Sequence, residues 1–255
     1  MIWMSRARDS GSVEYFFNSQ SLREDQLFQD MLPEAVKAFE AMKQIVLYPE
    51  GSMIFAEGQR PRGVYLLSQG RANLVMRPKG KRARIIRIAE QGEMLGLSAT
   101  ISGEPYEVTA ETLTPCQVGF IKRDDFLSLL REQPETCFRV AQLLGQSIHE
   151  SYERFPLFDK TLPASAKLAH LILSWCAGGE ETDEGIRLRL PLTHEQIARM
   201  IGTSRETVTR AFGEFRRKQI IQLEGATLLI LNLAELESVA KSCQRSQKLS
   251  CLRNF

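Results

Sequence analysis

The spacing of apolar residues divides the chain into a short helical segment, a β-rich middle and a helical end. Leu32, Val36, Phe39 and Met42 follow one another at intervals of three and four, which predicts a short amphipathic helix with Pro33 near its first turn. Residues 1–20 mix charge, Ser and Gly without a period, and we assign residues 1–30 to an N-terminal arm.

The pattern between Ile45 and Ile121 consists of short apolar runs of β type separated by glycines at turn spacing. The runs occupy residues 52–55, 63–67, 72–76, 84–88 and 116–121. Several short strands with regular turn signals predict an antiparallel sandwich or jelly roll. We therefore expect a β-domain over residues 31–133.

A helical pattern follows, from a short stretch opened by residues 122–126 into one long helix over residues 134–158. One row of its residues has the period of a coiled coil and predicts a seam between two copies of the chain. These residues are Cys137, Ala141, Leu144, Ile148, Ser151 and Phe155. The alternative is that the helix packs on its own sheet through Val140, Leu143 and Ile148. Pro156 interrupts the helix, and we place a domain boundary after residue 158.

Residues 193–202 have the pattern of a short helix with defined ends. Thr193 with Gln196 three residues later predicts a capping box, and Ile197 and Ile201 supply a buried face. Gly202 can adopt the left-handed conformation that ends a helix. The segment therefore predicts a first helix closed by a tight turn.

A second helix is predicted from Ser204, its N-cap, with an apolar face directed inward and a polar face directed outward. The inward residues are Val208, Ala211, Phe212 and Phe215. The outward residues at its N-terminal end are Arg205, Glu206, Thr209 and Arg210. An Arg fork matches O6 and N7 of guanine, and a carboxylate accepts from N4 of cytosine, so this face has the chemistry of base recognition in a major groove.

A further group of residues is suited to phosphate oxygens, which fix the register of a protein on DNA without carrying sequence information. These residues are Thr193, Ser204, Thr207 and Lys218. A pair of ordinary charged surface helices would show part of the same pattern. Residues 218–231, however, predict a β-hairpin directly after the second helix, and the combination favours a winged helix-turn-helix over residues 159–255.

At this point the sequence resembles a known family. Residues 192–210, above all Ser204 to Arg210, resemble the DNA-binding domain of the Crp/Fnr family, and residues 51–58 and 92–96 resemble that family's cyclic-nucleotide-binding-type β-roll. The resemblance covers about residues 30–235. It implies a homodimer joined by the long helix, a near-palindromic duplex DNA site with TGTGA-like half-sites, and RNA polymerase as a further partner.

The resemblance also implies a cyclic AMP pocket, but two of its positions depart from the pattern. The family places an acidic residue for the ribose hydroxyl just after residues 92–96 and an arginine for the phosphate some ten residues later. Here the first position holds Leu97 and the second falls near Tyr106 and Glu107. A phosphate beside Glu107 would be a buried charge without a partner, so the sequence argues against cyclic AMP.

Other cofactors of the family are also disfavoured by the sequence. Residues 1–115 contain no cysteine to hold the N-terminal iron–sulfur cluster of the oxygen-sensing branch. The imidazoles, His149, His170 and His194, lie outside the predicted β-domain, which argues against haem. Cys116 and Cys137 could sense oxidation, although a buried thiol is the simpler interpretation. No cofactor or metal is predicted, and a small-molecule or redox effector stays open.

Composition and net charge add little to these predictions. With 43% hydrophobic and 25% charged residues, the 255-residue chain has a globular composition. Residues 1–158 carry 19 Lys and Arg against 20 Asp and Glu, and residues 159–255 carry 14 against 11, a weak basic bias in the predicted DNA-binding part. The basic turn at residues 77–84 could touch RNA polymerase or DNA, but a solvated turn is the simpler interpretation.

The sequence also excludes several classes of protein. It lacks a long apolar run and a signal-peptide pattern, so we expect a cytoplasmic protein without a membrane partner. It contains no G-x-S-x-G, Walker A, H-E-x-x-H or Cys/His motif, so we expect no enzyme. The alternative to a regulator is a β-roll signalling or scaffold module that does not recognise an operator.

Overall fold

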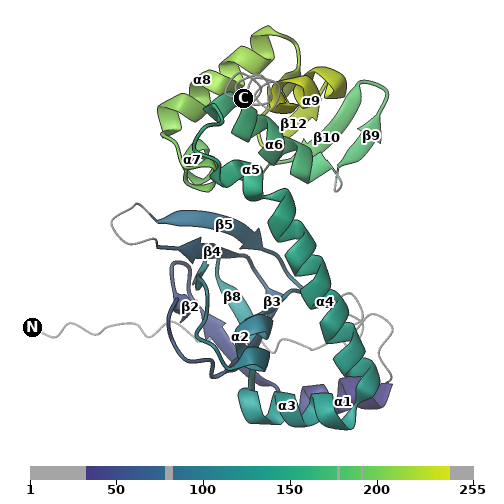
Figure 1. The fold of residues 1–255 in the computed structure, drawn as a ribbon. Coiled ribbons are helices and arrows are strands. Elements are labelled where there is room, and N and C mark those ends of the chain that lie inside the picture. The colour runs from purple at the N-terminus through teal and green to yellow at the C-terminus, as the bar shows by residue number, and fades with distance from the viewer. Residues whose placement is uncertain (1–32, 78–82, 177–178, 191, 242–255) are drawn as a thin grey trace, which may run out of the picture.

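The computed structural model describes residues 33–77, 83–176, 179–190 and 192–241. It contains a β-rich domain and a mainly helical domain connected by one long helix (Figure 1). The α+β class and the order of the parts agree with the sequence pattern. The predicted arm at 1–30, the tip of the basic turn at 78–82, Cys243 and Cys251 lie outside the described residues.

The N-terminal domain consists of two four-stranded antiparallel sheets within the described residues. One sheet has the order β1 (Gln44–Tyr48), β8 (Cys116–Lys122), β3 (Gly63–Gln69) and β6 (Met94–Leu95). The other has the order β2 (Met53–Phe55), β7 (Thr109–Thr112), β4 (Ala72–Met76) and β5 (Arg84–Ala89). The five predicted apolar runs all form strands. Sequence reasoning missed β1, whose residues are nearly all exposed, and β6 and β7, which are too short to show a period.

Helices cover one side of this domain and share an apolar layer with β3 and β8. They are α1 (Pro33–Met42), α2 (Leu97–Ser102), α3 (Arg123–Glu132) and α4 (Pro134–Glu153). Phe39 and Phe126 are fully buried in the layer, together with Val64 and Ile121 from the sheet. Val140 of α4 belongs to the same layer, so the first half of the long helix packs on its own domain.

The long helix does not continue to residue 158 as one piece. α4 ends at Glu153, and a separate short helix, α5 (Phe155–Phe158), follows with Pro156 in its first turn. Proline lacks the amide hydrogen that a continuous helix would need there, which explains the break. The connection between the two domains therefore bends where the sequence placed a boundary.

The C-terminal domain combines helices with a four-stranded sheet, counted over the described residues. The helices are α6 (Ala164–Cys176), α7 (His194–Ile201), α8 (Arg205–Arg217) and α9 (Leu233–Lys241). The sheet has the order β11 (Ile221–Glu224), β12 (Thr227–Ile230), β10 (Gly185–Arg189) and β9 (Glu180–Thr182). The β11–β12 hairpin confirms the predicted wing. β9 pairs with β10 in antiparallel fashion at the edge of this sheet.

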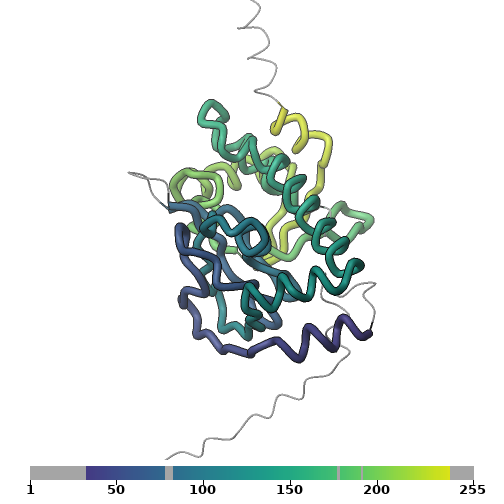
Figure 2. The backbone as a smooth tube through the Cα atoms, turned by 60° about the horizontal axis from the view of Figure 1, so that its bottom comes forward, coloured from purple at the N-terminus to yellow at the C-terminus, as the bar shows by residue number. Residues whose placement is uncertain are grey.

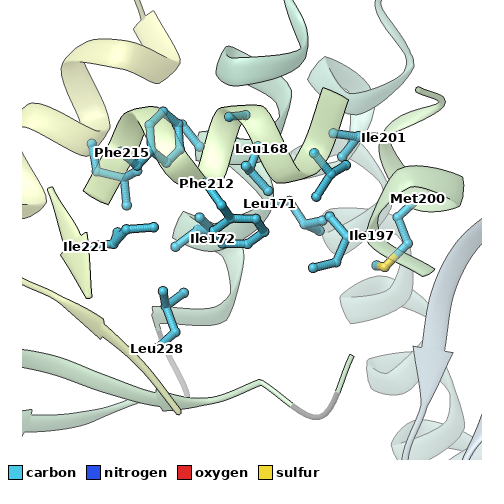
Figure 3. Close-up of a cluster of buried hydrophobic side chains, with 14 of the residues drawn as sticks. Leu168, Leu171, Ile172, Ile197, Met200, Ile201, Phe212, Phe215, Ile221 and Leu228 are labelled. Atoms are coloured by element: carbon cyan, nitrogen blue, oxygen red, sulfur yellow. The ribbon is translucent and has the colours of Figure 1, made fainter. Parts of the chain in front are cut away.

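The core of this domain fixes the position of α8. Phe212 and Phe215 of α8 are almost fully buried and lie among Leu168 and Ile172 of α6 and Ile221 of β11 (Figure 3). Figure 2 shows the backbone from a second direction, in which the two domains overlap in the view. Val75 and Ile85 of the β-domain join the same buried cluster, so the β4–β5 hairpin packs directly on the C-terminal domain.

Arg84 extends this contact and corrects one expectation. Its guanidinium lies 5.2 Å from the centre of the Phe158 ring, and it is half-buried rather than part of a solvated turn. It also lies against Gly202, where an added Cβ would come within 1.8 Å of its Nη2 atom. Burial lowers the pKa of Arg84. The last residue of the predicted basic turn is thus the first residue of β5, and it contacts α5 and the turn after α7.

Candidate nucleic-acid interface

Local hydrogen bonds set the two ends of α7. The Thr193 hydroxyl accepts from the Gln196 amide at 3.2 Å, and the Gln196 carboxamide oxygen accepts from the Thr193 amide at 2.8 Å, which completes the predicted capping box. Gly202 ends the helix with φ of 69°, a left-handed conformation that favours glycine. The turn into α8 is therefore specified by residues at both of its sides.

α8 begins directly after this turn, and its N-cap is the predicted one. The Ser204 hydroxyl accepts from the Thr207 amide at 3.2 Å. Val208, Ala211, Phe212 and Phe215 are all buried, as expected from their spacing. With that face fixed in the core, the opposite face of α8 has to point to solvent.

The four residues predicted to contact bases share this outer face. Arg205, Glu206, Thr209 and Arg210 are all exposed, and together they line one shallow hollow on the surface. Within the described part of the chain, neither Arg205 nor Arg210 forms an ion pair. Two guanidinium groups are thus presented to solvent without a carboxylate partner from this domain.

Glu206 differs from the two arginines because its carboxylate has partners. Hydrogen bonds from its own backbone amide and from the Ser204 side chain lower its pKa, and the positive charge of Arg205 adds to the effect. The carboxylate is fully exposed, so these bonds orient it at the surface. It remains ionised and retains lone pairs for an outside donor.

The predicted phosphate contacts fall in two places. Thr193, Ser204 and Thr207 lie at the N-terminal ends of α7 and α8, and the Ser204 and Thr207 hydroxyl oxygens are 3.0 Å apart. Lys218 follows the other end of α8, roughly 20 Å along a helix of this length. Its ammonium group pairs with Glu214 at 3.2 Å on the exposed surface. The structure therefore groups three of these residues beside the base-facing set and separates the fourth.

His194 is a residue at this surface that sequence reasoning treated only as an unsuitable haem ligand. Its Nδ1 atom lies 2.8 Å from the Thr209 hydroxyl, and its ring stacks on Phe212 with 5.0 Å between ring centres and 8° between planes. The sequence did contain a signal for this role, because His194 directly follows the N-cap of α7 and the N-terminal end of α7 lies beside the outer face of α8. His194 thus connects the first helix to a predicted base contact.

The predicted dimer seam on α4 is only partly exposed. Cys137, Ala141, Ile148 and Phe155 face solvent, and Ile148 and Phe155 are 56% and 59% exposed. Leu144 instead packs partly on the helical layer of its own domain. Ser151 is exposed, and its hydroxyl donates to the Ser147 carbonyl at 2.8 Å. Phe138 and Tyr152, which the predicted row omitted, are 64% and 61% exposed. The apolar stripe along α4 is therefore rotated slightly from the predicted one.

The alternative prediction, that α4 packs on the sheet of its own domain, explains the apolar residues on only one side of α4. Val140 is buried and Leu143 half-buried against the β-domain, whereas Ile148, the third residue of that alternative, is exposed. Both faces of α4 thus carry apolar residues. The β-domain covers one face, and the described chain leaves the other open.

Aromatic side chains fill the interior of the β-domain near the departures from the cyclic AMP pattern. Tyr106 is 3% exposed, and its ring stacks on Phe55 with 4.2 Å between centres. Its hydroxyl donates to the Gly63 carbonyl at 2.8 Å and accepts from the Arg62 amide at 3.1 Å. Leu97 is buried as well. This part of the interior is therefore occupied by the protein's own side chains.

Glu107, next to Tyr106, points outward to the surface rather than into this interior. Its carboxylate accepts from the Ser98 hydroxyl at 2.8 Å, and both residues are exposed. Burial is also the main reason why the pKa of Tyr65, another ring of the cluster, is raised. Of these two neighbours, only the aromatic residue Tyr106 therefore occupies the interior.

The histidines and cysteines do not gather. His149 pairs with Glu153 on α4, and His170 lies in α6, where burial lowers its pKa. Cys116 is buried in β8, and burial raises the pKa of its thiol. Over the described ranges, no group of His, Cys, Asp and Glu has the arrangement of a metal site. Among the helices in the same ranges, none has the length and apolar character needed to cross a bilayer.

Comparison with known proteins identifies both domains. A Crp-like helix-turn-helix domain matches residues 166–239, and a cyclic nucleotide-binding domain matches residues 45–133. The CRP-like cAMP-activated global transcriptional regulator of Mycobacterium tuberculosis is 28% identical over 218 residues, which cover 84% of this chain and 96% of the relative. The cyclic AMP receptor protein of Thermus thermophilus is 25% identical over 214 residues, with the same coverage of 84% and 96%.

The fold comparison agrees with these sequence matches. A solved CooA variant from Carboxydothermus hydrogenoformans superposes with a TM-score of 0.69 at 19% identity, over 84% of this chain and 93% of that one. The matched domains and relatives are transcription regulators and not enzymes.

Proposed function

The chain belongs to the Crp/Fnr family of DNA-binding transcription regulators, and we propose that it binds duplex DNA as a homodimer on a near-palindromic site with TGTGA-like half-sites. The observation that carries this proposal is the outer face of α8, where Arg205 and Arg210 point to solvent and form no ion pair with any described residue. Unpaired guanidinium groups on a helix held by a buried opposite face suit the major groove.

Each residue of this face has a proposed role. Arg205 and Arg210 donate to O6 and N7 of guanines, and Glu206 accepts from N4 of a cytosine. Thr209 contacts a further base. Thr193, Ser204 and Thr207, at two helix N-termini, contact phosphates together with their backbone amides. Lys218 contacts a phosphate farther along the groove and exchanges Glu214 for it.

The proposed dimer forms through the apolar stripe of α4. Phe138, Ile148 and Tyr152 of the 20-residue helix α4, and Phe155 at the start of α5, expose large apolar surfaces. Burying them against the same stripe of a second copy would remove this surface from water. Cys137 and Ala141 lie on the same side. A twofold dimer would place two copies of α8 about one DNA turn apart, roughly 34 Å.

The proposed effector is not cyclic AMP, although the names of the two relatives above refer to it. Tyr106 and Leu97 are buried where that ligand would need polar partners, and neither side chain can neutralise its phosphate. We propose no iron–sulfur cluster or haem. A different small molecule or a redox signal would act on the β-domain, whose β4–β5 hairpin contacts the DNA-binding domain.

The cellular setting follows from the proposed role. A regulator of this type acts in the cytoplasm, where its operator lies, and exerts its effect through RNA polymerase. The competing function, a signalling or scaffold module without operator recognition, would need no exposed base-reading arginines.

Selection of bound duplexes from a random pool tests the proposal. Purified protein is expected to enrich a palindrome with guanines at two positions of each half-site. The Arg205→Ala variant should bind the selected site about 1–3 kcal/mol more weakly and accept other bases at one position of each half-site. Equal binding by variant and parent, or no enriched sequence, would support the scaffold alternative.

A matched control separates base contacts from phosphate contacts. Lys218→Ala is expected to weaken selected and unrelated duplexes alike and to reduce the slope of log K against log salt by about 0.9 for each phosphate that is no longer neutralised. Arg205→Ala should instead weaken mainly the selected sequence. Similar effects of the two changes on all sequences would contradict the assigned roles.

A further inference from the structure

The contact between His194 and Thr209 determines which atoms of Thr209 are available to DNA. The Thr209 hydroxyl lies 3.0 Å from the Arg205 carbonyl, to which it donates, and 2.8 Å from Nδ1 of His194. A hydroxyl carries a single hydrogen. In either tautomer of the imidazole this hydrogen is used within the protein, because its two possible acceptors are the carbonyl and the ring nitrogen.

The His194 ring, which contacts the Thr209 hydroxyl, is itself fixed by packing. His194 stacks almost parallel on Phe212, which is 2% exposed in the core. The His194 side chain is half-buried, whereas Thr209 is exposed and lines the same hollow as Arg205, Glu206 and Arg210. The imidazole therefore approaches Thr209 from α7 and fixes its hydroxyl on the protein side. The methyl group is the part of the Thr209 side chain without a polar partner.

We propose that Thr209 recognises a thymine through contact between its methyl group and the C5 methyl of the base, and that His194 is the positioning residue that selects this orientation. The inference rests on the proposed function, since it assigns a base to one residue of the same face. Apolar contact is one of the ways in which threonine distinguishes thymine in a major groove. The hydroxyl, already bonded, does not donate to a base.

Two substitutions at residue 209 separate the methyl from the hydroxyl. Thr209→Val keeps the methyl and removes the hydroxyl, and Thr209→Ser does the reverse. Each is measured on the selected duplex and on duplexes in which uracil replaces one thymine of each half-site in turn. The parent and Thr209→Val are expected to lose about fourfold in affinity per half-site at one such position, from one buried methyl. Thr209→Ser should bind both duplexes equally.

His194 is tested in combination with these variants. His194→Ala is expected to reduce the thymine-over-uracil preference of the parent, because a hydroxyl held only by the Arg205 carbonyl can turn outward more readily. The same change in the Thr209→Val background should leave the preference unaltered, since valine has no hydroxyl to position. A purely structural role of His194 would instead lower thermal stability and weaken all duplexes equally in both backgrounds.

The possible outcomes distinguish this inference from the proposed function. A thymine preference kept by Thr209→Ser and lost by Thr209→Val would show that the hydroxyl recognises the base and would overturn the inference. The inference would also be overturned if the parent protein bound thymine and uracil duplexes equally at every position. If Arg205→Ala still lost specificity in that case, the proposed function would stand. If the parent selects no sequence, both fail.

Discussion

The outer face of α8 and the interior of the β-domain both contain polar groups on a firmly packed framework, but they differ in how those groups are satisfied. Inside the β-domain, the Tyr106 hydroxyl has protein partners on both sides, and Thr100 donates to the same Gly63 carbonyl at 2.8 Å. On α8, the guanidinium groups of Arg205 and Arg210 form no ion pair within the described residues.

This difference separates structural polar groups from groups available to a partner. A buried hydroxyl with two partners contributes to the stability of the fold, because leaving it unpaired would cost its desolvation. An exposed guanidinium without a carboxylate contributes little to folding, yet it keeps its donors for an outside acceptor. Substitutions in the first class should change stability, and substitutions in the second should change binding.

The largest expected effect concerns the buried side of α8, where a substitution should change stability as it does in a protein core. Phe212→Ala removes a ring that is 2% exposed and leaves a cavity, so the free energy of unfolding is expected to fall by about 3–5 kcal/mol. Chemical denaturation of the variant and the parent measures this loss.

A control for this effect lies one residue further along the same helix. Gly213 lies in the middle of α8 and is exposed to solvent, and an added Cβ there meets no atom within 4 Å. Gly213→Ala should therefore raise the free energy of unfolding, by about 0.5–1 kcal/mol. A small loss in Phe212→Ala would mean that the inner face of α8 is loosely packed, and the rigid placement of Arg205 and Arg210 would lose its basis.

A smaller effect is expected inside the β-domain. Tyr106→Phe keeps the stacking on Phe55 but leaves the Arg62 amide without the hydroxyl, while the Gly63 carbonyl retains Thr100. The free energy of unfolding is expected to fall by about 1 kcal/mol, and affinity for the selected duplex should be unchanged. Thermal unfolding and a DNA titration on the same sample check both statements.

An opposite result at Tyr106 would be informative. If Tyr106→Phe altered DNA affinity without changing stability, the hydroxyl would transmit a signal from the β-domain, and the distinction between the two regions would fail. The Arg205→Ala variant supplies the comparison, because it should change affinity and leave unfolding as in the parent.

The success of sequence reasoning also differed between the two regions. Both ends of α7 and the start of α8 were predicted to the residue, because Thr193, Gln196, Gly202 and Ser204 act through bonds to neighbours a few positions away. The wing followed from a local hairpin pattern. Once the start of α8 was known, the helical period was enough to predict which of its residues face outward.

The β-domain and α4 depend on contacts between distant segments, which periodicity does not encode. Leu144 has the spacing of the predicted seam but packs against its own domain, while Phe138 and Tyr152 are exposed. The stacking of Tyr106 on Phe55 joins residues 51 positions apart. His194 was missed for the same reason, because its importance comes from Thr209, which is adjacent only after the turn has formed.

The smallest expected effect concerns Glu206, a charged group on the outer face of α8 whose hydrogen-bonding capacity the protein satisfies in part. Its pKa is lowered by its own backbone amide and by the Ser204 side chain. A lowered pKa in the folded state adds stability above the unfolded value, roughly 4.3, and this contribution is lost as pH falls through the folded value. Glu206 should therefore stay ionised, and its preference for cytosine constant, from pH 8 down to about pH 5.

Ser204→Ala tests the cause of that shift. Removing the hydroxyl should raise the pKa of Glu206 toward its ordinary range, which a carboxyl-carbon NMR titration of the labelled protein can follow. Glu206→Gln serves to assign the signal and should weaken the preference for cytosine at every pH. An unchanged pKa in Ser204→Ala would mean that the backbone amide alone holds the carboxylate. Glu206 would then be oriented for its base independently of the helix cap, and the two regions would differ even more clearly in how their polar groups depend on neighbouring side chains.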